Sequence, residues 1–496
     1  MTKEGKKIIP ALRFQQWLDI WNAYEYKEEE QRKKPDKYLY MFSMNAAELR
    51  KFCDVYKRDR QGSSSEGIQR TRDKLRTNRI YRYIKYGYPY GDLNSVQMEE
   101  NESLRKPGWL PTAIVINILQ NGDKRKNKII SSEHLVKIEE DKNNFYKLEL
   151  PHNSDFSNSV APFEVIDGQH RLWSFDTNDD DEVIPENFEL PVIAFHGLDI
   201  AWQAYLFWSI NVSPKRINPS HAFDLYPLLR TQDWLERVDE LKVYREARAQ
   251  ELTEILYSQK GSPWKERINM LGERSAGSVS QAGWVRSLLA TFFSTGKGNS
   301  QKGLFQSNLD DNTPLEWSRS QQAAFIIQIW DDIKKEIENN KEEEWINKYK
   351  DSGKDPFSDK TSWLNQDQGV RAVLMVTNNL FYKNSSEWNL DNWFIGQDAS
   401  NNTSEENVNY ALKNLNEQSF RNYLKSLAQG IINFDWRSLK GPGVDEKSEE
   451  FKAEKRSYRG SGGYIALGHK ILKMIADDQN SNLRSYASKL LNETMA

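Results

Sequence analysis

The stretch from Pro162 to Phe175 constrains the fold more than any other part of this chain. It opens with Phe163–Ile166, which predicts a buried β-strand because Phe163, Val165 and Ile166 are aromatic or β-branched residues that favour strands. A polar turn follows, in which Asp167 is suited to cap a helix and Gly168 lets the backbone approach another group closely. The first helical turn then holds the donor-rich residues Gln169, His170 and Arg171. Because free N–H groups and the helix dipole favour an anion there, the stretch predicts a phosphate site.

The five residues from Asp167 to Arg171 match letter for letter the signature of the DGQHR-domain proteins. That group includes the DndB family, linked to DNA phosphorothioation, and relatives in deazapurine DNA-modification clusters. It looks like a branch of the ParB/sulfiredoxin-like superfamily, whose members hold a nucleotide's phosphates at an equivalent strand–turn–helix. The order that follows also resembles the family, with an apolar strand at Leu190–Leu198 and a helix ending in Phe207–Asn211. The resemblance covers roughly residues 8–290, and the chain has a larger C-terminal part than a minimal domain of this family needs.

The site that this resemblance implies gives each motif residue a role. Backbone N–H groups of Gly168 and Gln169, with the planar guanidinium of Arg171, would bind the phosphates of ATP or CTP, with or without Mg²⁺. His170 and Asp167 are the catalytic candidates: His170 would donate to a phosphate or position a water, and Asp167 would cap the turn or hold magnesium. No metal site follows from side-chain spacing. In the alternative interpretation the motif is a structural turn whose His170 and Arg171 bind the protein's own backbone and loops.

A second candidate element is the basic helix predicted from Glu66 to about Tyr86. Three of its arginines share one face at i, i+4 and i+7: Arg72, Arg76 and Arg79. Part of the segment resembles the family element that helps to build the nucleotide pocket, and the binding candidates there are Gln69, Arg70 and Arg76. The alternative is a solvated basic helix without a ligand.

The loop from Val212 to His221 contains two prolines and two neighbouring cations, Lys215 and Arg216. In the family the equivalent loop follows the helix packed on the motif, so Lys215 and Arg216 would cover the nucleotide. The alternative is an interdomain connection with two solvated cations.

The length of 496 residues predicts two or three domains, because it exceeds one ordinary core. The resemblance implies an α+β fold: a ParB/sulfiredoxin-like domain with a mixed sheet over residues 1–225, then a mostly α-helical domain over residues 226–496 for DNA or partner binding. The net charge of −3 leaves room for a local basic groove. Cys53 is the only cysteine, which excludes an internal disulfide and fits a cytoplasmic protein. No apolar span is long enough to cross a membrane.

The chain after Ala222 shows apolar residues at three- and four-residue spacing, which predicts helices. The predicted helices include Gln281–Phe293, Gln322–Ile337, Gln368–Leu380 and Ala411–Ile431. We interpret most of the 16 tryptophans as core residues rather than as platforms for stacked bases. A glycine-rich turn at Ser457–Tyr464 opens a helix, but its spacing is not that of a phosphate loop, and a flexible connector is the alternative.

Two functions are compatible with these features. The first is a ParB-like nucleotide-binding protein, an ATPase or CTPase, that acts with DNA and a modification enzyme in a bacterial DNA-modification or phage-defence system. The second is a DNA-binding regulator of the DndB type without nucleotide turnover. The sequence leaves open whether the chain self-associates.

Overall fold

The computed structural model describes residues 7–495 with gaps at 25–32, 56–72, 101, 103–104, 126–127, 153–155, 157–158, 176–186, 212–217, 230–234, 236–241, 273–278, 297–300, 306–307, 310–312, 396–401 and 461. The chain divides into two compact units, an N-terminal unit Met1–Lys215 and a helical unit Arg216–Ala496. The division lies before residue 225, where we predicted the domain boundary. The reason is that the segment after the gap packs with later helices: the Ser220 hydroxyl accepts a hydrogen bond from the backbone N–H of Ala282.

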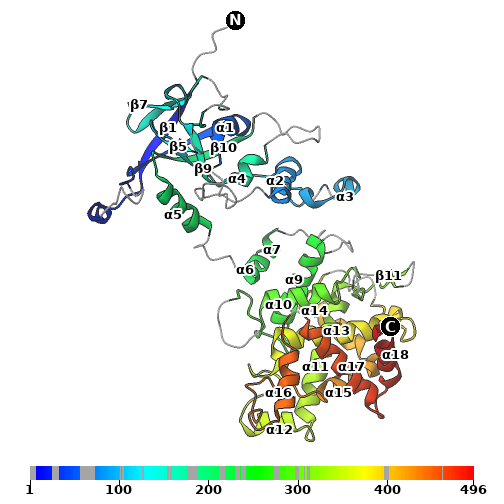
Figure 1. The fold of residues 1–496 in the computed structure, drawn as a ribbon. Coiled ribbons are helices and arrows are strands. Elements are labelled where there is room, and N and C mark those ends of the chain that lie inside the picture. Colours follow the sequence, from blue (N-terminus) through cyan, green and yellow to red (C-terminus); the bar gives the residue numbers. More distant parts are fainter. Residues whose placement is uncertain are drawn as a thin grey trace. The chain divides into compact units, whose positions relative to one another are not determined.

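The N-terminal unit is built on one mixed eight-stranded sheet in the order β3-β9-β4-β10-β2-β1-β8-β7 (Figure 1). Its strands are β1 (Ile8–Gln15), β2 (Tyr38–Asn45), β3 (Cys53–Asp54), β4 (Ile114–Ile118), β7 (Lys137–Lys142), β8 (Phe145–Glu149), β9 (Phe163–Asp167) and β10 (Glu189–His196). Strand β10 pairs in parallel with β4, and β3 with β9, whereas the other pairs are antiparallel. The short pair β5 (Lys124–Arg125) and β6 (Lys128–Ile129) forms a separate ribbon.

Helices of this unit are α1 (Ala46–Phe52), α2 (Lys74–Tyr86), α3 (Ser95–Glu100), α4 (Gln169–Trp173) and α5 (Ile200–Asn211), with 3-10 turns that include η1 (Asp19–Ala23). Helix α1 ends at Phe52 because Cys53 turns extended and pairs with Phe163. In the basic helix, Asp73 caps the first described turn by accepting from the backbone N–H of Arg76 at 3.1 Å.

The core of the N-terminal unit lies on the central strands. Strand β4 buries the side chains of Ile114, Ile116 and Ile118, and the motif strand β9 is buried from Phe163 to Ile166, its charged Glu164 included. Asn117 is the polar exception in β4. Its amide nitrogen donates to the carbonyl of Leu198 and its amide oxygen accepts from the N–H of Leu198, so it holds the turn before α5 rather than a ligand.

Cys53 is buried, and burial raises the pKa of its thiol, which supports a core residue over a nucleophile.

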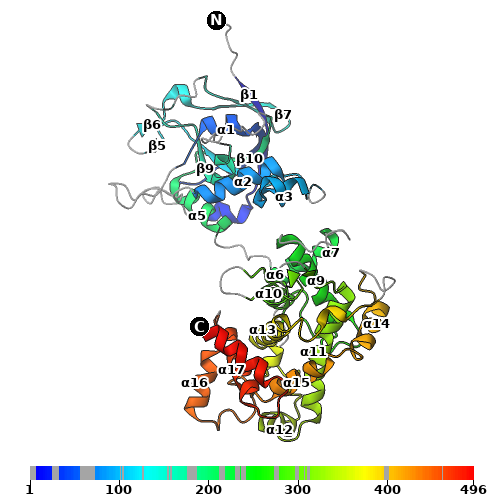
Figure 2. The ribbon, with the colours of Figure 1, turned by 90° about the vertical axis from the view of Figure 1, so that its right-hand side faces the viewer.

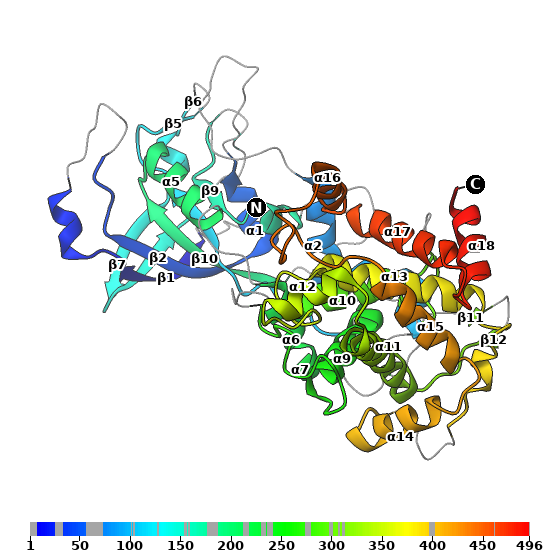
Figure 3. The same cartoon turned by 90° about the horizontal axis from the view of Figure 1, so that it is seen from below.

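The helical unit contains α6 (Pro219–Asp224), α7 (Tyr226–Leu229), α9 (Lys242–Ser258), α10 (Gln281–Ala290), α11 (Arg319–Asn339), α12 (Glu344–Asp351), α13 (Asp367–Lys383), α14 (Glu405–Leu415), α15 (Arg421–Ile432), α16 (Glu449–Ser457), α17 (Gly463–Asp477) and α18 (Arg484–Met495), besides the short pair β11 (Asn308–Leu309) and β12 (Thr313–Pro314). Helix α11 packs against α14 and α15, and α13 against α17 (Figure 3). The mostly helical prediction is therefore confirmed. The single helix predicted over Ala411–Ile431 is wrong, because the chain turns between α14 and α15.

Tryptophan rings fill the centre of the helical unit. Trp264, Trp284 and Trp330 meet edge to face, with ring centroids 4.9–5.7 Å apart. The fully buried tryptophans are Trp264, Trp284, Trp330, Trp345, Trp363, Trp388, Trp393 and Trp436, all in this unit. The interpretation of most tryptophans as core residues is confirmed for them.

Within the described ranges, every helix is too short or too polar to span a bilayer.

Candidate functional site

The motif forms the predicted strand–turn–helix. Strand β9 ends at Asp167, Gly168 adopts a left-handed conformation with φ of 94°, and α4 begins at Gln169. A Cβ atom on Gly168 would lie 2.7 Å from Cδ1 of Ile114 in the neighbouring strand. The backbone angle therefore favours glycine at this turn, and a larger residue would also force the buried Ile114 methyl to shift.

Gly168→Ala is expected to destabilise the N-terminal unit by about 2–3 kcal/mol, because it combines left-handed strain with a clash against Ile114. Gly122→Ala is the matched control, since Gly122 also has a positive φ of 91° but a Cβ there meets nothing within 4 Å. We expect the control to cost only about 1 kcal/mol. Hydrogen exchange of β4 and β9 peptides measures both, and equal losses would contradict the role of the close approach.

Asp167 does not cap α4, which corrects the sequence prediction. Its Oδ2 accepts from Nη2 of Arg171 at 2.9 Å, and its Oδ1 accepts from Nδ2 of Asn211, at the end of α5, at 3.2 Å. The N-cap position is Gly168 instead, and no side chain caps the helix. The carboxylate turns toward α5 and Arg171 because an ion pair with partly buried guanidinium is stronger than a bond to a neutral amide.

Arg171 is bound on both sides by the protein itself. Its Nη1 donates to the backbone and side-chain oxygens of Thr112, and its Nη2 forms the ion pair with Asp167. The side chains of Arg171 and Asp167 are 18% and 19% exposed, respectively. Burial lowers the pKa of Arg171, Asp167 raises it, and the nearby Arg76 lowers it. The guanidinium is thus already neutralised by one carboxylate before any ligand is considered.

His170 and Gln169 also contact the protein. Nε2 of His170 accepts from the backbone N–H of Asp73 at 3.2 Å, which ties α4 to the N-terminal end of α2 (Figure 1; α2 faces the viewer in Figure 2). A histidine that accepts at Nε2 carries its proton on Nδ1. The side chain of Gln169 is buried. These contacts match the structural-turn interpretation of the motif, in which His170 and Arg171 bind backbone and loops.

Helix α2 presents its cations beside this turn. Arg76 and Arg79 are exposed and make no ion pair with any residue that the structure describes. Arg82, by contrast, donates to the carbonyls of Gly91 and Leu93 and is structural. The other predicted binding residues, Gln69, Arg70, Lys215 and Arg216, lie outside the described residues.

Thr112 and Asn211 complete the network, and neither was predicted as a site residue. The sequence did contain a signal for Asn211, because this residue ends the helix that resembles the family element after the motif. Thr112 had none, since it lies two residues before β4 and contributes its carbonyl and hydroxyl only through the fold.

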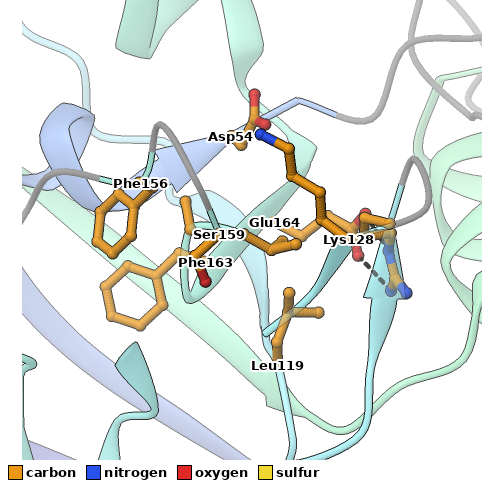
Figure 4. A pocket seen from close by; sticks show the side chains of 10 residues that line it. Asp54, Leu119, Lys128, Phe156, Ser159, Phe163 and Glu164 are labelled. Carbon is orange, nitrogen blue, oxygen red and sulfur yellow. Dashed lines mark hydrogen bonds and ion pairs between the residues drawn. The ribbon is translucent and has the colours of Figure 1, made fainter. Parts of the chain in front are cut away.

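A cavity of about 180 Å³ lies at the other end of β9, beside Phe163 and Glu164 (Figure 4). Its charged lining residues include Asp54, Lys128 and the buried pair formed by Glu164 and Arg125, whose two N···O distances are 2.8 Å. Pockets for small molecules usually measure about 300–1,000 Å³. This cavity is therefore too small for a nucleotide, and no residue of the motif lines it.

The glycine-rich turn before α17 has a packing role. A Cβ on Gly463 would lie 2.0 Å from the carbonyl oxygen of Tyr458, so glycine is needed for close contact within the turn. Across the described ranges, no three His, Cys, Asp or Glu side chains converge to hold a metal ion. No protein-family model, curated protein or solved structure matches the chain.

Proposed function

We propose that the N-terminal unit binds DNA phosphates on the exposed face of α2 beside the DGQHR motif. In this proposal the protein is a DNA-binding regulator of the DndB type in a bacterial DNA-modification or phage-defence system, and its sheet is a ParB/sulfiredoxin-like domain. One observation carries the proposal: Arg76 and Arg79 are exposed without a described ion-pair partner, next to a motif whose own arginine is already neutralised.

The charges beside the motif leave a positive excess. Arg171 and Asp167 cancel each other, whereas Arg76 and Arg79 stand at i and i+3 on one face of α2, with Lys74 exposed in the same turn. Nearby like charges repel, and an anion between them offsets that repulsion. A DNA strand provides such anions at regular spacing, and cations that contact phosphates release counterions on binding.

The motif contributes by positioning α2. His170 accepts from the backbone of Asp73, and Asp73 caps the helix that carries Arg76. Gly168 permits the tight turn that brings α4 to this place. The motif would then hold the basic helix against the sheet, while a modification enzyme of the same system would be brought to DNA through this protein.

A second candidate is nucleotide binding, favoured by the proximity of Arg76 to Arg171 at the start of α4. The first-turn amides of α4 have no partner within the helix, and Gly168 and Gln169 would present them to a phosphate of ATP or CTP. This candidate requires Arg171 to keep its bonds to Asp167 and Thr112 while Arg76 provides the free charge. His170 has no role as a base in it, because its Nε2 is occupied by Asp73.

Arg76→Ala/Arg79→Ala tests the DNA proposal in the full-length protein. We expect affinity for a fluorescent duplex to fall about 100-fold at low salt, since two charged hydrogen bonds of about 1.5 kcal/mol each sum to about 3 kcal/mol. The slope of log K against log salt should become shallower by about 2. Anisotropy titrations at several salt concentrations measure both quantities.

Lys124→Ala/Lys142→Ala is the control, because it removes the same charge from exposed lysines outside α2. Its affinity and salt slope should fall much less. If the two double variants lose equal affinity, α2 is not the binding surface. Calorimetry with ATP, CTP and GTP, with and without Mg²⁺, tests the second candidate: nucleotide binding that Arg76→Ala abolishes, beside unchanged DNA affinity, would replace the DNA proposal.

A further inference from the structure

Helix α5 has an unusual distribution of buried residues. Its sequence, Ile-Ala-Trp-Gln-Ala-Tyr-Leu-Phe-Trp-Ser-Ile-Asn, has no charged residue, yet its buried residue is the polar Gln203. Nε2 of Gln203 donates to Oε2 of Glu164 at 2.8 Å and to the carbonyl of Leu198 at 3.0 Å. Tyr205 and Trp208, at i and i+3, are 55% and 54% exposed. Helix α5 is therefore attached to the sheet by a polar side chain and presents aromatic rings outward.

Tyr205, but not Trp208, lines a cavity of about 610 Å³ between α5 and the segment around η1. Its lining residues are Gln16, Trp17, Trp21, Tyr24, Ala201, Trp202 and Tyr205. The ring plane of Trp202 makes angles of 65° and 87° with those of Tyr24 and Tyr205. The aromatic walls of the cavity therefore meet at a steep angle, and a planar group can lie against one of them. The volume falls within the range of about 300–1,000 Å³ that is typical of small-molecule pockets.

Positive charge lies at the edge of the cavity. Nε1 of Trp202 donates to the carbonyl of Lys33 at 3.0 Å, and the N–H of Lys33 donates to Oδ2 of Asp199 at 2.7 Å. This pair of bonds fixes a lysine-bearing segment beside the aromatic walls, and its exposed lysines are Lys33, Lys34 and Lys37. No acidic side chain is among the described residues that line the cavity, although Asp36 and Asp199 lie in or beside the lysine-bearing segment. Aromatic rings beside lysines are the composition that binds single-stranded nucleic acid, where bases stack and cations contact phosphates.

We propose that this cavity takes an unpaired nucleobase of a DNA strand, with the neighbouring phosphates on the lysine segment. The inference rests on the proposed DNA-binding function and specifies an unpaired base as its ligand. Paired bases do not fit, because a base must leave the duplex to lie between protein rings.

Helix α5 also sets the spacing between the two sites. Its last residue, Asn211, contacts Asp167 of the motif, whereas Ala201 at its start lines the cavity. At about 1.5 Å per residue the two ends lie about 15 Å apart, which corresponds to about four stacked nucleotides at about 3.4 Å each. Trp208 lies between them on the face of Tyr205, so one strand can run from the cavity to the motif along α5.

The test uses the full-length protein with three probes of equal length: single-stranded oligo-dT, an oligonucleotide of abasic sugars, and a duplex. We expect oligo-dT to bind at least 10-fold more tightly than the abasic strand and to quench tryptophan fluorescence. Trp21→Ala/Tyr205→Ala should lower oligo-dT affinity about 10- to 100-fold and leave abasic and duplex affinities unchanged. The control Phe145→Ala/Tyr410→Ala removes two exposed rings elsewhere and should change none of them.

Equal affinity for oligo-dT and the abasic strand would overturn the inference. So would a cavity variant that loses a dimer in sedimentation, or one that lowers the unfolding temperature without changing affinity, because the rings would then be buried against a second copy or serve only to stabilise the fold. Failure of the proposed function is distinguishable: it shows as unchanged duplex affinity in Arg76→Ala/Arg79→Ala, whose residues do not line the cavity.

Discussion

Arg125→Ala is expected to destabilise the N-terminal unit by about 3–5 kcal/mol, because it leaves a buried carboxylate without its counter-ion. Nε and Nη2 of Arg125 each donate to one oxygen of Glu164 at 2.8 Å, and the two side chains are only 10% and 7% exposed. Gln203 would remain as the one described hydrogen-bond donor to Glu164, and a neutral amide cannot replace the guanidinium.

Hydrogen exchange followed by mass spectrometry measures this loss in the unit itself, on peptides that contain β9 and β4. Lys147→Ala is the matched control, because Lys147 forms an ion pair with Asp141 in which both side chains are 48% exposed. An exposed pair contributes about 0–1 kcal/mol. If Arg125→Ala changes protection no more than Lys147→Ala, Glu164 is not held by the pair in solution.

Raising the pH from 8 to 10 is expected to stabilise the helical unit by about 2–3 kcal/mol through Lys455. Burial lowers the pKa of Lys455 to about 8, against about 10.4 in an unfolded chain. Between these values the unfolded chain binds a proton that the folded chain has released, so the free energy of unfolding rises with pH. Above this window Tyr349 and Tyr458, whose pKa values burial raises, act in the opposite direction.

Lys455→Met should remove this rise and stabilise the unit at pH 7. The ammonium of Lys455 lies 4.2–5.1 Å from the ring centroids of Trp363, Phe434 and Phe451, and a thioether suits such surroundings. Urea unfolding at pH 7–10, followed by the fluorescence of the buried tryptophans, compares the two proteins. A rise of the same size in both would assign the pH dependence to other groups.

The central part of the fold was predictable because its signals are local. An aromatic residue and two β-branched residues, a glycine and a polar helical turn specify β9, Gly168 and α4 without any long-range information. The side-chain partners were not predictable to the same extent. A carboxylate at Asp167 can cap a helix or pair with an arginine, and the choice depends on Asn211, which lies 44 residues further along the chain.

Errors in the helical unit have a similar cause. No proline or glycine separates α14 from α15, so the sequence of Ala411–Ile431 gives no breaker signal, and the packing of both helices on α11 decides the turn. Helix α12 lies in a stretch that charge dominates. Its buried residues, Trp345, Ile346 and Tyr349, are few enough that the charges obscure their helical spacing.

In α5, the residue that anchors the helix to the sheet, Gln203, is different from the residues that form its exposed surface. A helix that is anchored by hydrogen bonds to Glu164 and Leu198 keeps its place when its outward rings change. Mutations at Tyr205 or Trp208 can therefore accumulate without loss of the sheet beneath. What this surface binds can therefore be altered by substituting its rings while the scaffold stays the same.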